Sequence, residues 1–256
     1  MGGIDFDLQT AMPPRALREA LDALPESHRT LADMPILQDI RLDTIALLAS
    51  GARQFELGRS ESVFHRGSSP TGLYFVISGG VKLMTLGPDN RARVVELFQP
   101  YGMFGEIGVF TGASYRTWTQ TIAPSVLLEV SRECVLAAVD SDHKLAVRML
   151  TAVTARTQRL IDGISCTSPS TAAVRVAAYI LELADRSNAP DGPIVLPASK
   201  GTIASLLNLS QESLSRVLRR MKDAGLLMVS GRRIHIHDRQ GLSRILCGDV
   251  LAQDVA

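Results

Sequence analysis

The chain has 256 residues, with 27 Lys and Arg against 26 Asp and Glu, and a formal net charge of +1. This length suits two domains, and a hydrophobic share of 46% can form packed cores, so global disorder is excluded. The balanced charge argues against a basic packaging protein, although a balanced total can hide a local basic surface.

The cysteines and the N-terminal residues indicate in which cellular compartment the protein is expected. Three cysteines lie far apart, at Cys134, Cys166 and Cys247, and form no CxxC or CxxH pair. We therefore expect no metal site, and so few thiols are typical of a reducing compartment. The opening MGGIDFDLQT lacks the features of a signal peptide, and no apolar run approaches the ~20 residues of a membrane helix. These features predict a cytoplasmic protein without membrane contact.

The first half of the chain changes pattern twice. Residues 1–35 hold two short helical patterns broken by prolines, which predict an N-terminal helical extension, and residues 36–50 have apolar residues at helical spacing. Short β-rich runs follow between about 52 and 130: ARQFEL, SVF, LYFVIS, VKLMTL, RVVELF, TWTQTIA and VLLEV. Turn signals separate these runs, which favours an antiparallel barrel or sandwich.

Residues 132–164 return to helical periodicity. Apolar or small residues recur there at spacings of four and three: Ala146, Leu150, Val153, Thr157, Leu160 and Ile164. This spacing is typical of a two-position heptad seam. It fits either an amphipathic helix lying on its own domain or a dimer helix paired with its twin, and spacing alone does not separate the two.

A basic segment follows the small-residue hinge at 165–170 and a predicted helix at 170–186. Between residues 199 and 233 seven basic residues face two acidic ones, a net charge of +5: Lys200, Arg216, Arg219, Arg220, Lys222, Arg232 and Arg233 against Glu212 and Asp223. A basic stripe of this kind gains free energy on a polyanion through counterion release. The asymmetry favours DNA binding over an ordinary solvated helix.

The same segment has the pattern of a helix-turn-helix followed by a hairpin. Ser199 and Ser210 are suited to cap two helices, and Asn208-Leu209-Ser210 supplies a short break between them. The apolar residues are expected to pack inward: Ile203, Leu206, Leu207, Leu209, Leu214, Val217, Leu218 and Met221. The polar residues left to point outward are Gln211, Glu212, Ser215, Arg216 and Arg219. Arg suits guanine acceptors, Glu can accept from cytosine, and Arg232 at the hairpin tip could contact phosphate.

Several segments resemble the CRP/FNR superfamily of bacterial regulators. SQESLSRVLRRMKDAGLL and VSGRRIHIHD look like its winged helix-turn-helix, while GLYFVISGGVKLM and PYGMFGEIGVF are similar to its cyclic-nucleotide-binding-like β-roll. The resemblance spans residues ~35–245 and implies an α+β fold. The expected parts are a jelly-roll β-roll sensor at 36–135, a dimerisation helix at 136–166 and a winged helix-turn-helix at 167–256.

The resemblance also implies residues for DNA and for the dimer. Glu212, Ser215 and Arg216 form the E-x-x-S-R pattern of the fumarate-nitrate regulator branch, which implies an inverted repeat of TTGAT-like half-sites. Lys200 and Ser210 match phosphate-contacting positions. The dimer seam would consist of Leu150, Val153, Thr157, Leu160 and Ile164.

An effector site is expected in the β-roll. A glycine-flanked turn, Gly105-Glu106-Ile107-Gly108, can present backbone N–H groups to an anion, and Arg116-Thr117 could hold a phosphate. Together they resemble the phosphate cassette of the cyclic-AMP receptors, with Glu106 accepting from a ribose hydroxyl. The alternative is a structural Glu–Arg pair that closes a β-corner.

The identity of the effector stays open. Leu160 and Ile161 stand where the receptors present Thr and Ser to adenine, which puts cyclic-nucleotide recognition in doubt. A haem-based nitric-oxide sensor is a second possibility, with His28, His65 or His143 as ligand, and a ligand-independent regulator is a third. An iron–sulfur cluster is excluded because the first 133 residues contain no cysteine.

The sequence therefore predicts a regulator and not an enzyme, since no nucleophile–base pair or catalytic dyad stands at a recognisable spacing. The expected partners are double-stranded DNA, RNA polymerase, a second copy of the chain and a small-molecule effector.

Overall fold

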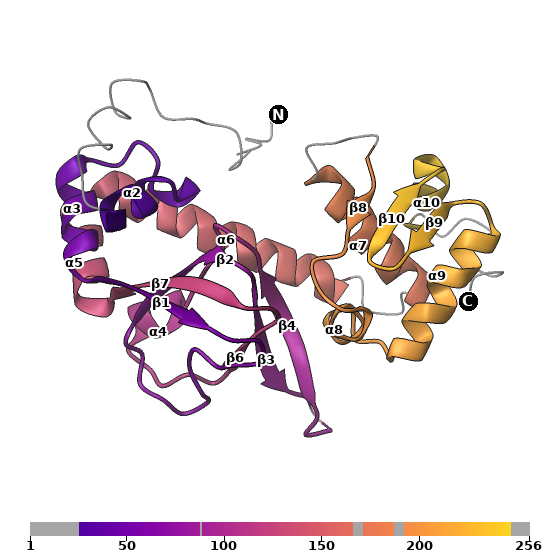
Figure 1. The fold of residues 1–256 in the computed structure, drawn as a ribbon, viewed down its shortest axis with the longest axis horizontal. Helices are drawn as coiled ribbons and strands as arrows, with labels where there is room; N and C mark the ends of the chain where they lie inside the picture. The colour runs from indigo at the N-terminus through magenta and orange to yellow at the C-terminus, as the bar shows by residue number, and fades with distance from the viewer. Residues whose placement is uncertain (1–25, 88, 166–170, 187–191, 247–256) are drawn as a thin grey trace. The chain divides into compact units, whose positions relative to one another are not determined.

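The computed structural model describes residues 26–87, 89–165, 171–186 and 192–246 (Figure 1). These residues fall into two compact units, one built from 26–86 and 96–157 and the other from 87–95 and 158–246. Residues 1–25 of the predicted extension at 1–35 and residues 166–170 of the predicted hinge lie outside the described residues. Within the described part, no helix is both long and apolar enough to cross a membrane.

A β-roll with helices at both ends of its sequence makes up the first unit, although residues 92–95 of β4 and 158–165 of α6 fall in the second. Its strands are β1 (Ala52–Leu57), β2 (Gly72–Ser78), β3 (Val81–Leu86), β4 (Ala92–Phe98), β5 (Met103–Phe104), β6 (Trp118–Thr121) and β7 (Ser125–Ser131). They form two sheets with strand orders β1-β7-β2-β5 and β4-β3-β6. Strand β7 pairs antiparallel with β1 and β2, and β3 pairs antiparallel with β6. The antiparallel β-roll expected from the sequence is confirmed.

Helices of the first unit lie before, within and after the roll. They are α2 (Glu26–Ala32), the 3-10 helix η1 (Pro35–Leu37), α3 (Leu42–Ser50), α4 (Glu106–Thr111), α5 (Arg132–Ser141) and α6 (His143–Ser165). One face of the β2–β7 sheet packs against the helical layer through Leu73, Phe75 and Leu128. Inside the roll, an aromatic cluster fills the space between the sheets: Phe64, Tyr74, Phe98, Phe104 and Tyr115.

Two local expectations about the roll are wrong. The run SVF at 62–64 is not a strand, because Thr119 Oγ1 accepts from the backbone N–H groups of Val63 and Phe64 and so replaces a strand partner. The segment after Gly105 is not a simple turn but the short helix α4. Gly105 precedes it with a left-handed φ of 95°, a conformation that favours glycine.

The single helix expected over 136–166 is also wrong, since the chain breaks at Asp142. This residue has an extended φ of −129° and separates α5 from α6. Its carboxylate accepts from the backbone N–H groups of Lys144 and Leu145 at the start of α6 and from Thr44 Oγ1 at 2.7 Å. The break is therefore fixed by a contact with a residue that lies about 100 positions earlier in the chain.

The second unit combines helices with a small sheet. Its elements are α7 (Ala172–Asp185), β8 (Ile194–Val195), α8 (Lys200–Leu206), α9 (Gln211–Asp223), β9 (Leu227–Ser230), β10 (Arg233–Ile236) and α10 (Arg239–Leu246). The sheet order is β8-β10-β9, with both pairs antiparallel. This arrangement confirms the winged helix-turn-helix. Most of its expected core is buried, including Ile203, Leu214, Leu218 and Met221, whereas Leu206, Leu207 and Leu209 are half-buried.

Candidate DNA-reading surface and sensor site

Helices α8 and α9 begin at the two serines that the sequence marks as caps. Ser199 Oγ accepts from the backbone N–H of Thr202, and Ser210 Oγ accepts from that of Ser213 at 3.0 Å. Both caps satisfy an N–H group that would otherwise lack a partner in the first turn of its helix. The prediction of both helix starts is confirmed.

The turn between the helices depends on a left-handed residue. Asn208 has a φ of 54°, and asparagine tolerates this region better than most residues do. The backbone N–H of Leu209 then returns to the carbonyl of Ala204 at 2.8 Å, so the chain reverses within a few residues. This geometry orients α9 against α8 through the buried residues Ile203 and Leu214.

The first half of α9 presents a polar, exposed face. Glu212, Ser215 and Arg216 are exposed, and none of them makes a side-chain hydrogen bond or ion pair with another described residue. Arg219 is also exposed and lies 3.9 Å from the carboxylate of Asp223. Such a face leaves a carboxylate, a hydroxyl and a guanidinium available to an external partner.

Three further residues expected at this surface have contacts within the protein. Gln211 is exposed, yet its Oε1 would lie only 3.0 Å from a Cβ atom added at Gly201, so its side chain extends over the start of α8. The Ser210 hydroxyl is engaged in its cap, and Lys200 is half-buried at the first residue of α8. These three positions are therefore less free than the outward face of α9.

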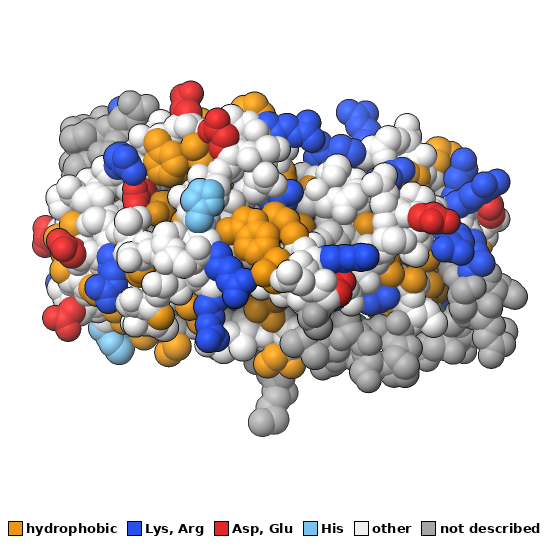
Figure 2. All heavy atoms as spheres, turned by 90° about the horizontal axis from the view of Figure 1, so that it is seen from below, with side chains coloured by type: hydrophobic (Ala, Val, Ile, Leu, Met, Phe, Trp, Pro, Cys, Tyr) orange, Lys and Arg blue, Asp and Glu red, His pale blue; other side chains and the backbone are white. Residues whose placement is uncertain are grey.

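The hairpin of β9 and β10 turns at Gly231, whose φ is 61°. Arg232 is exposed at this turn, but its Nε and Nη2 donate to the carbonyl of Leu196 at 2.9 and 2.6 Å. Its guanidinium thus joins the turn to Leu196, the residue after β8. Only its remaining N–H groups are available to a phosphate. On the face drawn in Figure 2, Lys and Arg side chains lie over both units.

Helix α6 exposes apolar side chains along the expected seam. Leu150 is 67% exposed and Leu160 is 40% exposed, and Val147 and Ile161 are exposed to similar degrees. Val153 is half-buried and Thr157 is exposed. The side chain of Ile164 lies outside the described residues. Exposed aliphatic residues at helical spacing mark a face that lacks a partner within the described chain.

In the sensor unit, Glu106 does not pair with Arg116. Arg116 is exposed and makes no hydrogen bond or ion pair with a described residue, and Thr117 is half-buried. Ile107 is 66% exposed on α4. The Glu–Arg pair at a β-corner, which was the alternative to an effector site, is therefore not formed by these two residues.

Glu106 instead pairs with an arginine that the sequence did not single out. Its Oε1 accepts from Arg156 Nη1 of α6, and Arg156 Nε lies 2.5 Å from Glu96 Oε2 on β4. The guanidinium carbon lies 5.0 Å from the centre of the Phe98 ring. The side chains of Arg156 and Glu106 are only 14% and 5% exposed. We call Glu96, Glu106 and Arg156 the ion triad.

One signal for Arg156 was present in the sequence. It follows Val153 by three residues and precedes Leu160 by four, so helical spacing places it beside the seam. Its two acidic partners lie 50 or more positions earlier in the chain, Glu96 on β4 and Glu106 directly after Gly105. No local pattern in the sequence links them to the helix.

The histidines give little support to a haem site. His65 and His143 are both exposed, and the side chain of His28 lies outside the described residues. The interior of the roll holds the aromatic cluster. Neither His65 nor His143 is therefore buried where a haem between the roll and α6 would need its ligand.

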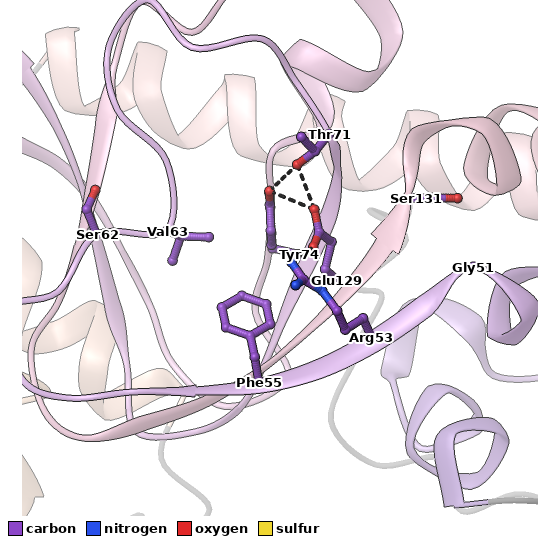
Figure 3. A pocket seen from close by; sticks show the side chains of 9 residues that line it. All are labelled: Gly51, Arg53, Phe55, Ser62, Val63, Thr71, Tyr74, Glu129 and Ser131. Atoms are coloured by element: carbon purple, nitrogen blue, oxygen red, sulfur yellow. Dashed lines mark hydrogen bonds and ion pairs between the residues drawn. The ribbon is translucent and has the colours of Figure 1, made fainter.

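A separate pocket of about 510 Å³ opens on the first unit (Figure 3). Its walls come from β1, the loop before β2, β2 and β7: Gly51, Arg53, Phe55, Ser62, Val63, Thr71, Tyr74, Glu129 and Ser131. Glu129 accepts from Thr71 at 2.6 Å, from Tyr74 at 3.1 Å and from Arg53 at 2.7 Å. None of the residues expected to bind an effector lines this pocket.

The polar groups of the pocket are committed to one another. Burial alone would raise the pKa of Glu129, but the hydrogen bonds from Thr71, Arg53 and Tyr74 outweigh it and lower that pKa. Burial raises the pKa of Tyr74 to about 12. An ionised acceptor and a protonated donor therefore join β1, β2 and β7, which indicates a structural network.

Comparison with known proteins matches each unit separately. Residues 54–142 match the cyclic nucleotide-binding domain, and residues 174–245 match the Crp-like helix-turn-helix domain. The two matches follow one another in the order expected from the sequence.

Similar whole proteins are regulators. A CRP-like cAMP-activated global transcriptional regulator from Mycobacterium tuberculosis is 24% identical over 84% of this chain and 97% of its own length. The nitrogen fixation regulation protein FixK from Azorhizobium caulinodans is 29% identical over 73% of this chain and 76% of its own. The structure of FixK2 from Bradyrhizobium japonicum aligns with a TM-score of 0.69 and 26% identity, covering 76% of this chain and 96% of that one.

These relatives are transcription regulators and not enzymes, as the sequence predicts for this chain. They do not assign it to the fumarate-nitrate branch within the family. A β-roll that matches the nucleotide-binding family and a winged helix-turn-helix that matches the Crp-like domain occur in one chain, and the chain therefore belongs to the CRP/FNR family of transcription regulators.

Proposed function

We propose that this protein acts in the cytoplasm as a homodimer that reads an inverted repeat in double-stranded DNA and regulates transcription by RNA polymerase. The observation that carries this proposal is the exposed face of α9, where Glu212, Ser215 and Arg216 have no described intramolecular partner. The N-terminal half of the second helix is the part of a helix-turn-helix that enters the major groove.

The expected target is a pair of TTGAT-like half-sites. Arg216 has the geometry to donate two hydrogen bonds to guanine, and Glu212 can accept from a cytosine amino group. Lys200, Arg219 and the remaining donors of Arg232 would contact phosphates, which position the protein without reading sequence. Two α9 helices about 34 Å apart would meet successive turns of one DNA face.

The second copy is expected to pack along α6. Leu150 and Leu160 expose large aliphatic side chains on this helix, with Val153 and Thr157 between them. Pairing two such faces would bury apolar surface that the single chain leaves in water. A two-fold axis in the protein then accounts for a two-fold axis in the DNA site.

Control by a small effector is the expectation that the sensor geometry supports least. A cyclic nucleotide would use the Glu106 carboxylate for its ribose, and one oxygen of that carboxylate, Oε1, is already paired with Arg156. The two candidate haem ligands with described side chains, His65 and His143, are both exposed. Of the three possibilities, the arrangement of the ion triad favours ligand-independent DNA binding.

The test is fluorescence anisotropy with a duplex that contains a TTGAT inverted repeat and a duplex of random sequence. We expect Arg216→Ala to weaken binding of the repeat by about tenfold to a hundredfold, with little effect on the random duplex. Arg186→Ala is the control, because Arg186 is an exposed arginine at the end of α7, paired with Glu182. Equal losses on both duplexes would show that Arg216 contacts only phosphate and would refute base reading.

A further inference from the structure

The hairpin of β9 and β10 carries two histidines that the DNA-reading proposal does not use. His235 lies on β10 and His237 follows directly after it, and both side chains are exposed. β10 is the middle strand of the sheet in the second unit (Figure 1). Strand pairing continues to His237, because its backbone N–H donates to the carbonyl of Leu226 at 2.9 Å. Alternate residues of an extended strand share one face, so the two imidazoles lie on the same side of the hairpin.

A methionine lies opposite the first of these histidines. In the antiparallel register of β9 and β10, Met228 pairs with His235. The side chain of Met228 is 49% exposed. Paired residues of antiparallel strands point to the same face, with Cβ atoms about 4.5–5.5 Å apart. The thioether of Met228 therefore lies on the face of the two imidazoles. We call Met228, His235 and His237 the hairpin cluster.

The spacing of the hairpin cluster suits the ligands of one metal ion. His235 and His237 are two residues apart, so their Cα atoms are separated by about 6.6 Å along the strand. Two metal–imidazole bonds of about 2 Å each allow the two ring nitrogens to lie up to about 4 Å apart. The two rings meet this limit when their side chains rotate toward each other. The unbranched side chain of Met228 is flexible enough to bring its sulfur to the same ion.

The hairpin cluster is available to a ligand from outside the chain. None of its three side chains makes a hydrogen bond or ion pair with another described residue. The carboxylate of Asp238, by contrast, accepts from the backbone N–H of Gly241 at 2.8 Å and lies 3.6 Å from Arg244. Among the described residues, no three His, Cys, Asp or Glu side chains lie together as a metal site. The third ligand of the two histidines is therefore the methionine.

The types of ligand in the hairpin cluster select the metal. A thioether is a soft ligand that prefers copper(I), and imidazole also binds copper. Magnesium, calcium and manganese prefer carboxylate and carbonyl oxygens, which the cluster lacks. The exposed Arg233 lies on the same face, two residues before His235. Its positive charge repels a divalent ion more strongly than a monovalent one, which again favours copper(I).

We propose that Met228, His235 and His237 form a binding site for copper(I), with two imidazole nitrogens and one thioether sulfur as ligands. The expectation that the chain has no metal site rests on its cysteines and takes no account of thioether ligands. The copper site is independent of the proposed function, because no DNA contact is needed to hold the ion. Its tests therefore contain no DNA, and their outcome is separate from that of the DNA-reading proposal.

The first test measures the affinity of the full chain for copper(I). The reference protein has all three cysteines changed to serine, because thiolates would otherwise compete for the ion. Met228→Leu, His235→Gln and His237→Gln each remove one ligand from this reference. The three side chains are exposed, so these substitutions remove no core contact. His143→Gln is the control, because it removes an exposed histidine at the start of α6.

Copper(I), kept reduced by ascorbate in the absence of oxygen, is divided between the protein and the coloured chelator bicinchoninate, whose absorbance gives the affinity. Loss of an outer-shell partner already costs a metal site about tenfold or more in affinity, so loss of a ligand should cost at least as much. We expect this loss in each ligand variant and none in His143→Gln. An affinity that stays unchanged in Met228→Leu or in either variant of the hairpin histidines would overturn the proposal.

The second test uses the native chain with its thiols. Its methionines carry a carbon-13 label in the ε-methyl group, and the nuclear magnetic resonance signal that is missing in Met228→Leu belongs to Met228. We expect this signal to shift when copper(I) is added in excess over the three thiols, whereas the signal of the buried Met34 stays in place. A Met228 signal that does not move would overturn the proposal.

Discussion

The two units treat their arginines in opposite ways. In α9, Arg216 is exposed and has no partner among the described residues, and Arg219 is exposed beside an exposed Asp223. In the sensor, Arg156 is largely buried between two carboxylates and an aromatic ring. The exposed guanidinium of Arg216 is available to a polyanion such as DNA. The buried guanidinium of Arg156 is paired within the protein and fixes the position of α6. The same side chain therefore serves recognition in one unit and internal order in the other.

The largest expected effect comes from removing the buried arginine. Arg156→Ala removes the cation that pairs with the buried carboxylate of Glu106, which should destabilise the sensor by about 3–5 kcal/mol. Arg219→Ala removes an exposed arginine and should change stability by less than about 0.5 kcal/mol. Trp118, the single tryptophan of the chain, lies on β6 and reports unfolding of the sensor in urea by fluorescence. Equal losses of stability in Arg156→Ala and Arg219→Ala would contradict the difference proposed between the buried and the exposed arginine.

The second effect concerns the exposed apolar face of α6. Leu150→Asp places a charge in the proposed seam and should raise the dimer dissociation constant by about a hundredfold, since a buried unpaired charge is costly. Leu150 is 67% exposed in the single chain, so the fold of each subunit should persist. Sedimentation equilibrium measures the change, and Thr154→Asp at another exposed position of the helix is the control. A dimer that survives Leu150→Asp unchanged would exclude this face as the seam.

A third difference is expected in acid. Burial would raise the pKa values of Glu129 and Asp142, but hydrogen bonds from Thr71 and Thr44, respectively, with other donors, lower both. Their stabilisation is complete above the pKa of about 4 of an unfolded carboxyl and is lost as pH falls through the lower folded values. Trp118 fluorescence in urea should therefore show the sensor weakening below about pH 4. In Glu129→Gln this acid dependence should be shallower, and an identical dependence would show that Glu129 does not contribute.

The smallest effect concerns the cap of the reading helix. Ser210→Ala removes the acceptor of the Ser213 N–H and should cost the second unit about 1 kcal/mol. Thermal unfolding followed by far-ultraviolet circular dichroism measures it, with the exposed Ser230→Ala as control. The unfolding transition of the sensor, reported by Trp118, should not change in Ser210→Ala. A shift of that transition would show that the cap also stabilises the first unit, and would contradict this prediction.

Features with local causes were predictable from the sequence. The caps Ser199 and Ser210 and the hairpin at Gly231 each depend on residues within a few positions, and the structure has all three. The outward set on α9 followed from helical spacing and charge. The β-roll was identified from a resemblance to a family, since its strand runs alone fitted either a barrel or a sandwich.

Features set by distant contacts were not predictable. The break at Asp142 depends on Thr44, and the loss of a strand at 62–64 depends on Thr119. The predicted alternative, a pair of Glu106 with Arg116, is wrong. Glu106 pairs with Arg156 instead, and this pairing arises only after the sheet and α6 pack together. Side chains that meet through tertiary packing leave no spacing signal in one sequence.

The most direct test of the central claim is selection of duplexes from a random pool by the purified wild-type chain, without any added small molecule. The account predicts enrichment of an inverted repeat whose half-sites are centred about one helical turn, or ~34 Å, apart. It also predicts that Arg216→Ala loses this enrichment at one base pair of each half-site. Enrichment of no sequence, or of a single half-site without its inverted copy, would contradict a dimer that reads DNA through α9.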